Sequence, residues 1–170
     1  MPIQIRALQK SDQRTAFQSG QPDLDTFFHQ FAGQNQFRHH IGITYIATDE
    51  ENIGGYVTVA AGSIETAELP EGSKLPPNYP LPILRLGRLA VDQRYQGQGI
   101  GKLLLRYVFG LALQQKERLG CVGIIVDAKP EAIPFYQKYG FQALEKPIEG
   151  EISGHPSPVP MFLSIKSIPG

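Results

Sequence analysis

The chain has little cysteine, no net charge and no long apolar run, and each absence excludes a class of protein. Cys121 is the only cysteine among 170 residues, which excludes an internal disulfide and a cysteine-based metal site. The 16 basic residues balance 16 acidic ones, so composition gives no dedicated basic surface for nucleic acid. No run approaches the ~20 apolar residues of a membrane span, and residues 1–12 lack a signal-peptide pattern. We therefore expect a cytoplasmic protein with no metal and no membrane contact.

Length and apolar content indicate a single globular domain. The chain has 170 residues, of which 41% are hydrophobic, enough to bury a substantial core. Neither an internal repeat nor a composition change marks a boundary. We assign residues 1–170 to one domain.

A glycine-rich turn stands at the centre of the sequence. Residues 96–101 read Gln-Gly-Gln-Gly-Ile-Gly, between a β-prone stretch at 84–91 and a helical pattern from residue 100. Glycine tolerates positive φ and lets a ligand approach the backbone. Where such a turn opens a helix, free N–H groups and the helix dipole favour a phosphate. The turn therefore predicts a phosphate-bearing ligand.

Two nucleotide motifs are excluded at this turn. The dinucleotide pattern G-x-G-x-x-G fails because Lys102 follows Gly101. A P-loop needs glycine at position 96 and Ser or Thr at position 103, where this chain has Gln96 and Leu103. The remaining pattern is Q-x-x-G-x-G on a strand-to-helix turn.

The strand before the turn changes its apolar phase. Leu84 and Leu86 alternate, and the alternation resumes one residue out of step at Leu89 and Val91. A slip of one residue turns side chains to the other face unless a β-bulge absorbs it. We predict a bulge at residues 87–88, with loosened pairing beyond it that frees backbone groups for an extended ligand.

The remaining patterns predict a mixed α/β chain. Strands are expected at residues 2–8, 41–48, 54–64, 84–91, 121–126, 141–144 and 159–165, and helices at 22–36, 100–119 and 131–139. The strands at 41–48 and 54–64 should form a hairpin, and the helix at 100–119 should connect two parallel strands. Proline-rich residues 68–82 and residues 146–158 are expected as loops.

Two motifs together resemble the GCN5-related N-acetyltransferases, the GNAT superfamily. The motifs are Gln96-x-x-Gly99-x-Gly101 and Ala132-x-x-Phe135-Tyr136-x-x-x-Gly140-Phe141. The resemblance implies an α/β (α+β) GNAT fold, a mixed and mostly antiparallel sheet with one parallel strand pair and helices on both faces. It also implies acetyl transfer from acetyl-CoA to a primary amine by direct attack on the thioester.

The resemblance implies which residues bind acetyl-CoA. Leu89, Ala90 and Val91 would pair with the pantetheine arm like an added strand. Arg94 and Lys102 would add positive charge near the phosphates. The pyrophosphate would be held by the backbone of Gln96, Gly97, Gln98, Gly99, Ile100, Gly101 and Lys102.

Tyr136 matches the tyrosine that many GNAT enzymes use as general acid. A phenol there would protonate the leaving thiolate, and a strand amide near Val91 would stabilise the oxyanion. The alternative for Tyr136 is a core aromatic beside Phe135. No general base stands out: Glu65 and Asp127 are candidates by position only, as is Glu131. Because an α-amine titrates near ~8, a strong base is not required.

The first half resembles the GNAT toxins of toxin–antitoxin modules, which acetylate the α-amine of aminoacyl-tRNA. The segments that carry this likeness are Phe17-x-x-Gly20, Leu24-Asp25-x-Phe27-Phe28, residues 55–64 and residues 86–92. It implies aminoacyl-tRNA and a small DNA-binding antitoxin as partners, with a homodimer as a further expectation. A net charge of zero is not what a tRNA-binding protein is expected to have, because binding tRNA calls for Lys and Arg side chains that neutralise phosphates. The basic residues that would have to gather are Arg6, Arg14, Arg38, Arg85 and Arg88.

Three functions therefore stay open. The first is a general amine N-acetyltransferase, the second is a toxin that acetylates aminoacyl-tRNA, and the third is a non-catalytic module that binds acetyl-CoA. The turn identifies the donor and leaves the acceptor undetermined.

Overall fold

The computed structural model describes residues 2–70, 74–77, 79–144 and 158–169. The predicted loop at residues 146–158 lies outside the described residues except at its last position. The strands are β1 (Gln4–Ala7), β2 (Ile43–Thr48), β3 (Ile53–Ile64), β4 (Leu81–Val91), β5 (Gly123–Ala128), β6 (Gln142–Ala143) and β7 (Val159–Ser164). The helices are α1 (Pro22–Thr26), α2 (Ile100–Arg118) and α3 (Ile133–Lys138).

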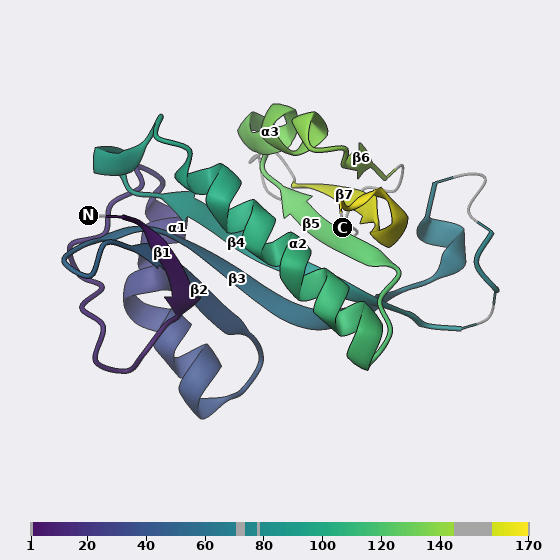
Figure 1. Ribbon diagram of the computed structural model, residues 1–170, viewed down its shortest axis with the longest axis horizontal. Helices are drawn as coiled ribbons and strands as arrows, with labels where there is room; N and C mark the ends of the chain where they lie inside the picture. The colour runs from purple at the N-terminus through teal and green to yellow at the C-terminus, as the bar shows by residue number, and fades with distance from the viewer. Residues whose placement is uncertain (1, 71–73, 78, 145–157, 170) are drawn as a thin grey trace. The chain divides into compact units, whose positions relative to one another are not determined.

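The described strands form one sheet in the order β1-β2-β3-β4-β5-β7-β6 (Figure 1). β1 with β2, β2 with β3, β5 with β7 and β6 with β7 are antiparallel. β4 and β5 run parallel: Val122 N–H, just before β5, donates to Pro82 O at the start of β4, and Arg85 reaches Asp127 further along both strands. The predicted fold class is confirmed.

The chain packs as two compact units. One contains residues 1–60 and 86–110, and the other contains residues 61–85 and 111–170. β3, β4 and α2 each contribute residues to both units. The assignment of residues 1–170 to a single functional domain stays a prediction.

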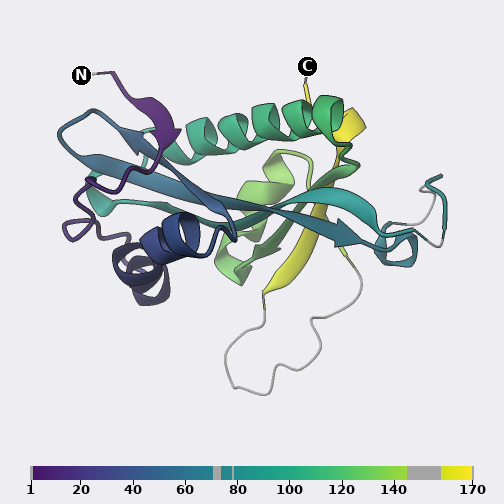
Figure 2. The same ribbon diagram turned by 90° about the horizontal axis from the view of Figure 1, so that it is seen from below.

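In the first unit, helices cover both faces of β3 (Figure 2). A Cβ atom at Gly55 would stand 2.8 Å from Ile100 and 3.0 Å from Leu104, so this glycine lets α2 pack closely on one face. On the other face the Tyr56 ring stacks on Phe28, with 4.5 Å between centroids. Neighbouring residues of β3 therefore pack against helices on opposite faces of the strand.

The helix that begins at Pro22 extends further than predicted. After α1 it continues through π-helical turns at Phe27–Phe31 and Gln34–Arg38, so it ends at Arg38 rather than near residue 36. The predicted aromatic face is buried at Phe27 and Phe28, but Phe31 is 45% exposed. π turns hold more residues than α turns, which rotates Phe31 off the face that regular α spacing predicts.

β4 begins at Leu81, three residues before the predicted start. The expectation of loop structure for residues 68–82 is therefore wrong at Leu81 and Pro82. Proline is tolerated here because its carbonyl still accepts a hydrogen bond, from Val122 N–H at 2.8 Å. The preceding segment also contains a short 3₁₀ turn at Thr66–Glu68.

α2 and its end agree with the sequence. The helix ends at Arg118, and Gly120 has φ +97° with its N–H bonded to Gln115 O. Positive φ there explains a glycine at the helix end. Among the residues that the structure describes, no helix has the length and apolarity to span a membrane.

Candidate active site

Side-chain directions reveal a bulge in β4. Gly87 faces β3: a Cβ atom built on it would stand 2.9 Å from Thr58 Oγ1. Three residues later, Ala90 packs in the same buried cluster as Tyr56, which lies two residues from Thr58 on the same face of β3. Residues three apart on a regular strand point to opposite faces, so the phase slips between them. The predicted slip is confirmed.

The bulge lies at Gly87 and Arg88, opposite Thr58. Asp92 N–H donates to Gly54 O at 2.8 Å, which aligns the end of β4 with the start of β3. β3 and β4 run antiparallel, because a Cβ atom built on Gly62, near the end of β3, would stand 2.9 Å from Ile83, near the start of β4. Counting back along this pair from Asp92 places Arg88 across from Thr58, the residue that Gly87 also faces. Two residues of one strand opposing one residue of its partner is the definition of a β-bulge. Loosened pairing at Leu89, Ala90 and Val91 stays a prediction.

The glycine-rich turn has the backbone that its sequence predicts. Gly97 and Gly99 have φ +80° and +82°, values that other residues rarely adopt. A Cβ atom at either position would meet nothing within 4 Å. Packing therefore does not require glycine at these positions, whereas backbone conformation and access from outside both favour it.

The turn leads directly into α2. Leu103 N–H donates to Gly99 O at 3.1 Å, the first bond of the helix. The N–H groups of Ile100, Gly101 and Lys102 precede this ladder and have no acceptor within it. Because they open a helix of 19 residues, these groups form the positive end of a long helix dipole. A phosphate suits this position.

Side chains brace the turn. Gln96 Nε2 donates to Val91 O at 3.1 Å and to Ser19 O at 3.0 Å. Asp92 is 1% exposed, and its carboxylate accepts from Gln18 N–H at 3.0 Å. Burial alone would raise the pKa of Asp92. Hydrogen bonds from Arg94 and Gln18 outweigh that effect and hold the pKa below its usual value.

The two predicted basic groups differ. Arg94 Nε lies 3.0 Å from Asp92 Oδ1, so much of the Arg94 charge is balanced by this carboxylate, and the ion pair stabilises the turn. Lys102 is exposed on the first turn of α2. The sequence did not single out Asp92, although a carboxylate directly after a buried strand was visible there.

Tyr136 lies in α3 of the second unit and is 4% exposed. Its ring packs edge-on against Phe135 and Phe141, with centroids 5.2 and 5.4 Å away. Burial raises the pKa of its phenol, which therefore stays protonated at neutral pH. Packing accounts for the ring, so the role of the hydroxyl stays a prediction.

The candidate bases have structural explanations. Asp127 pairs with Arg85 at 2.9 Å. The Glu65 side chain caps the 3₁₀ turn, together with Glu68 Oε1 at 3.2 Å from Glu65 N–H. Glu131 is exposed in the Pro130–Ala132 turn. Among the described residues, no set of three or more metal-binding side chains converges.

The arginines expected to meet nucleic acid are partly engaged. Arg6 pairs with Asp12 at 2.8 Å, and Arg85 pairs with Asp127. The Arg88 guanidinium lies 3.9 Å from the Phe27 ring centroid. The Arg85–Asp127 pair is the more exposed of the two, and exposed ion pairs are weak and can exchange partners when a phosphate arrives, whereas Arg6 and Asp12 are part-buried and joined by two hydrogen bonds.

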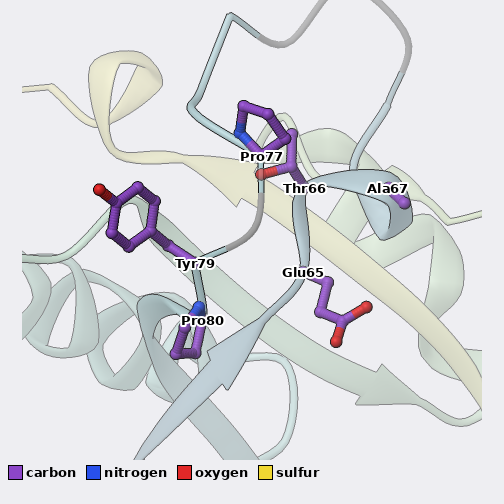
Figure 3. Close-up of a pocket in the computed structure, with 6 residues that line it drawn as sticks. All are labelled: Glu65, Thr66, Ala67, Pro77, Tyr79 and Pro80. Atoms are coloured by element: carbon purple, nitrogen blue, oxygen red, sulfur yellow. The ribbon is translucent and has the colours of Figure 1, made fainter.

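The second unit contains a cavity of about 420 Å³. The sequence did not predict this cavity. Figure 3 shows its residues on the 3₁₀ turn and on the proline-rich segment before β4. Tyr79 projects away from Glu65 and is 62% exposed. The residues that line it are Glu65, Thr66, Ala67, Pro77, Tyr79 and Pro80.

Comparison with known proteins agrees with this geometry. Residues 40–143 match the family model described as Acetyltransferase (GNAT) domain. The tRNA-acetylating toxin of Mycobacterium tuberculosis is 31% identical over 138 residues, 81% of this chain and 82% of that protein.

Two solved structures are similar over nearly the whole chain. The structure of AtaT complexed with acetyl-methionyl-tRNAfMet has a TM-score of 0.82 and 28% identity, over 98% of this chain and 97% of that one. The structure of AtaTR bound with AcCoA has a TM-score of 0.77 and 30% identity, over 98% and 95%. Together with the matching family model and the Mycobacterium tuberculosis relative, these structures establish that this chain belongs to the GNAT family of N-acetyltransferases.

Proposed function

We propose that this protein transfers the acetyl group of acetyl-CoA to the α-amine of an aminoacyl-tRNA, as the toxin of a toxin–antitoxin module. The observation that carries the proposal is likeness along 98% of the chain to a structure of AtaT with acetyl-methionyl-tRNAfMet. The similarity to a tRNA-acetylating toxin supports the same acceptor. A second chain that binds and inhibits the enzyme is part of the proposal.

Acetyl-CoA fits the first unit. The open space at Gly97 and Gly99, together with the helix N-terminus behind them, suits its pyrophosphate. The backbone of Leu89, Ala90 and Val91 would hold the pantetheine arm. Acetyl-CoA supplies an acetyl group activated as a thioester.

Tyr136 is proposed as the general acid. Its buried phenol holds a proton on Oη at neutral pH, as an acid for a leaving thiolate requires. The α-amine of an aminoacyl ester reaches its neutral form near neutral pH without a strong base. This explains a site in which Asp127 and Glu65 serve structural contacts.

A second candidate acceptor is a small amine or a protein amine. Zero net charge and the ion pairs of Arg6 and Arg85 favour an acceptor with few phosphates. Gene context and growth separate the two candidates. A toxin should arrest growth when expressed alone, and a small DNA-binding protein encoded next to it should restore growth.

Release of free thiol from acetyl-CoA tests the activity directly. The panel contains charged tRNA, uncharged tRNA, free amino acids, polyamines and a peptide with a free N-terminus. We expect thiol release with charged tRNA alone. Release with a small amine and not with charged tRNA would replace the proposal with the second candidate. Silence throughout, with acetyl-CoA bound, would indicate a non-catalytic module.

A further inference from the structure

A buried hydroxyl opposite the β4 bulge lacks a hydrogen-bond partner. Thr58 is 9% exposed, and its Oγ1 is fully buried without a donor or acceptor. Among the described side chains only Gln21 Oε1 shares this state. An unpartnered buried hydroxyl lowers stability relative to a methyl group of the same shape. Such a group calls for an explanation beyond folding.

Glycine at position 87 leaves room for this hydroxyl. A Cβ atom there would stand 2.9 Å from Thr58 Oγ1, closer than such contacts occur. Gly87 itself is exposed, as is Arg88, whose guanidinium lies over Phe27. The hydroxyl therefore lies beneath the exposed backbone of the bulge. To reach a molecule outside the sheet, the hydroxyl must swing out by rotation about the Cα–Cβ bond of Thr58.

In the proposed donor site, the bulge would lie towards the reactive end of acetyl-CoA. Coenzyme A carries its phosphates at one end and its thioester at the other. With the phosphates at Gly97 and Gly99, the arm would run back along β4 from Val91 to Leu89. The residues next in line are Arg88 and Gly87, which Thr58 opposes.

We propose that the Thr58 hydroxyl contacts the acceptor amine. Oγ1 accepts one N–H hydrogen bond from the amine that lies over Gly87, and this contact orients the nitrogen lone pair. The hydroxyl keeps its own hydrogen, so no proton is consumed. This inference rests on the proposed acetyl transfer and adds an acceptor-binding residue to it.

The test compares Thr58→Val with Thr58→Ser. Valine keeps the shape and removes the hydroxyl, whereas serine keeps the hydroxyl. Three quantities are measured for each variant: the melting temperature, the Kd of acetyl-CoA and the kcat/KM of the acceptor that the wild type acetylates. We expect Thr58→Val to lower kcat/KM at least about tenfold. Its acetyl-CoA Kd should be unchanged and its melting temperature equal to or above that of the wild type.

Thr58→Ser should retain kcat/KM within about threefold. A melting temperature that falls in Thr58→Val shows that the hydroxyl stabilises the fold and overturns the inference. Wild-type kcat/KM in that variant overturns it while leaving acetyl transfer intact. A wild type that acetylates no amine overturns both claims, so the two failures are distinguishable.

Discussion

Gln96 and Val91 join the two halves of the proposed donor site: Gln96 Nε2 donates to Val91 O at 3.1 Å. Val91 ends β4, and Gln96 begins the glycine-rich turn. The same nitrogen also reaches Ser19 O at 3.0 Å. This side chain thus holds the turn against the strand and against the segment before α1.

Removing that brace should weaken cofactor binding. Gln96→Ala should raise the Kd of acetyl-CoA by roughly tenfold, since about 1.4 kcal/mol of ordering is lost. Isothermal titration calorimetry measures it. Gln98→Ala is the matched control, because Gln98 makes one longer bond, 3.3 Å to Arg94 O, and should leave the Kd within about twofold. Equal effects would show that Gln96 has no special role.

A methyl group at Gly99 should block the phosphate position. Gly99→Ala forces a positive φ on alanine, which costs about 1–2 kcal/mol, and places a Cβ atom in the open space above the turn. We expect at least a tenfold rise in the acetyl-CoA Kd. Gly110→Ala, inside α2 where a Cβ meets nothing, should gain up to about 1 kcal/mol of stability without changing the Kd. Wild-type affinity in Gly99→Ala would exclude the turn as the phosphate site.

The phenol of Tyr136 is predicted to act in turnover. Tyr136→Phe should lower kcat about 100-fold or more and leave the acetyl-CoA Kd unchanged. Tyr139→Phe is the control, since that ring also packs on Phe135, with 5.2 Å between centroids. Pre-steady-state thiol release would compare the variants. Undiminished turnover in Tyr136→Phe would assign Tyr136 to the core alone.

The pH profile follows from the direction of the Tyr136 pKa. Burial raises this pKa, so the protonated form that an acid needs persists to higher pH than for an ordinary tyrosine. The neutral amine, in contrast, accumulates as pH rises towards ~8. Hence kcat/KM should increase from pH 6 and level off by about pH 9, with no alkaline fall in that range. A fall between pH 8 and 9 would require a different acid.

The carboxylate of Asp92 should make stability depend on acid pH. Its pKa is lower in the folded state than the ~3.9 of an unfolded chain, so its stabilisation is complete above that value. The stabilisation is lost as pH falls through the folded pKa. Asp92→Asn should cost about 2 kcal/mol at pH 7 and flatten this acid dependence. Urea unfolding of the wild type and of Asp92→Asn at several pH values measures both effects. If the free energy of unfolding fell equally with acid pH in the two proteins, Asp92 would not be the source of the acid dependence.

Much of the donor site could be predicted because it depends on local chemistry. Positive φ at Gly97 and Gly99 follows from the residue type, and the bulge at Gly87 and Arg88 follows from apolar spacing. The parallel pair of β4 and β5 follows from the helix between them. The glycine conformations and the bulge are encoded within about 20 neighbouring residues, and the parallel pair within one strand–helix–strand segment, residues 81–128.

The features that were missed depend on distant contacts or on backbone irregularity. The π turns after Thr26 rotate Phe31 to the surface, which regular helical spacing does not anticipate. Pro82 lies in β4, where its carbonyl accepts a hydrogen bond from the N–H of Val122, 40 residues further along the chain. The burial of Asp92 depends on Gln18, and the unpartnered hydroxyl of Thr58 depends on Gly87. None of these pairs is adjacent in sequence.

Acetylation of charged tRNA is the most direct test of the central claim. The purified protein is incubated with acetyl-CoA and a mixture of aminoacyl-tRNAs, and the aminoacyl-adenosines released by nuclease are examined by mass spectrometry. The proposal predicts aminoacyl-adenosine carrying one acetyl group on its α-amine, and its loss in Tyr136→Phe. Unmodified aminoacyl-adenosine, from a protein that binds acetyl-CoA and acetylates another amine, would contradict it.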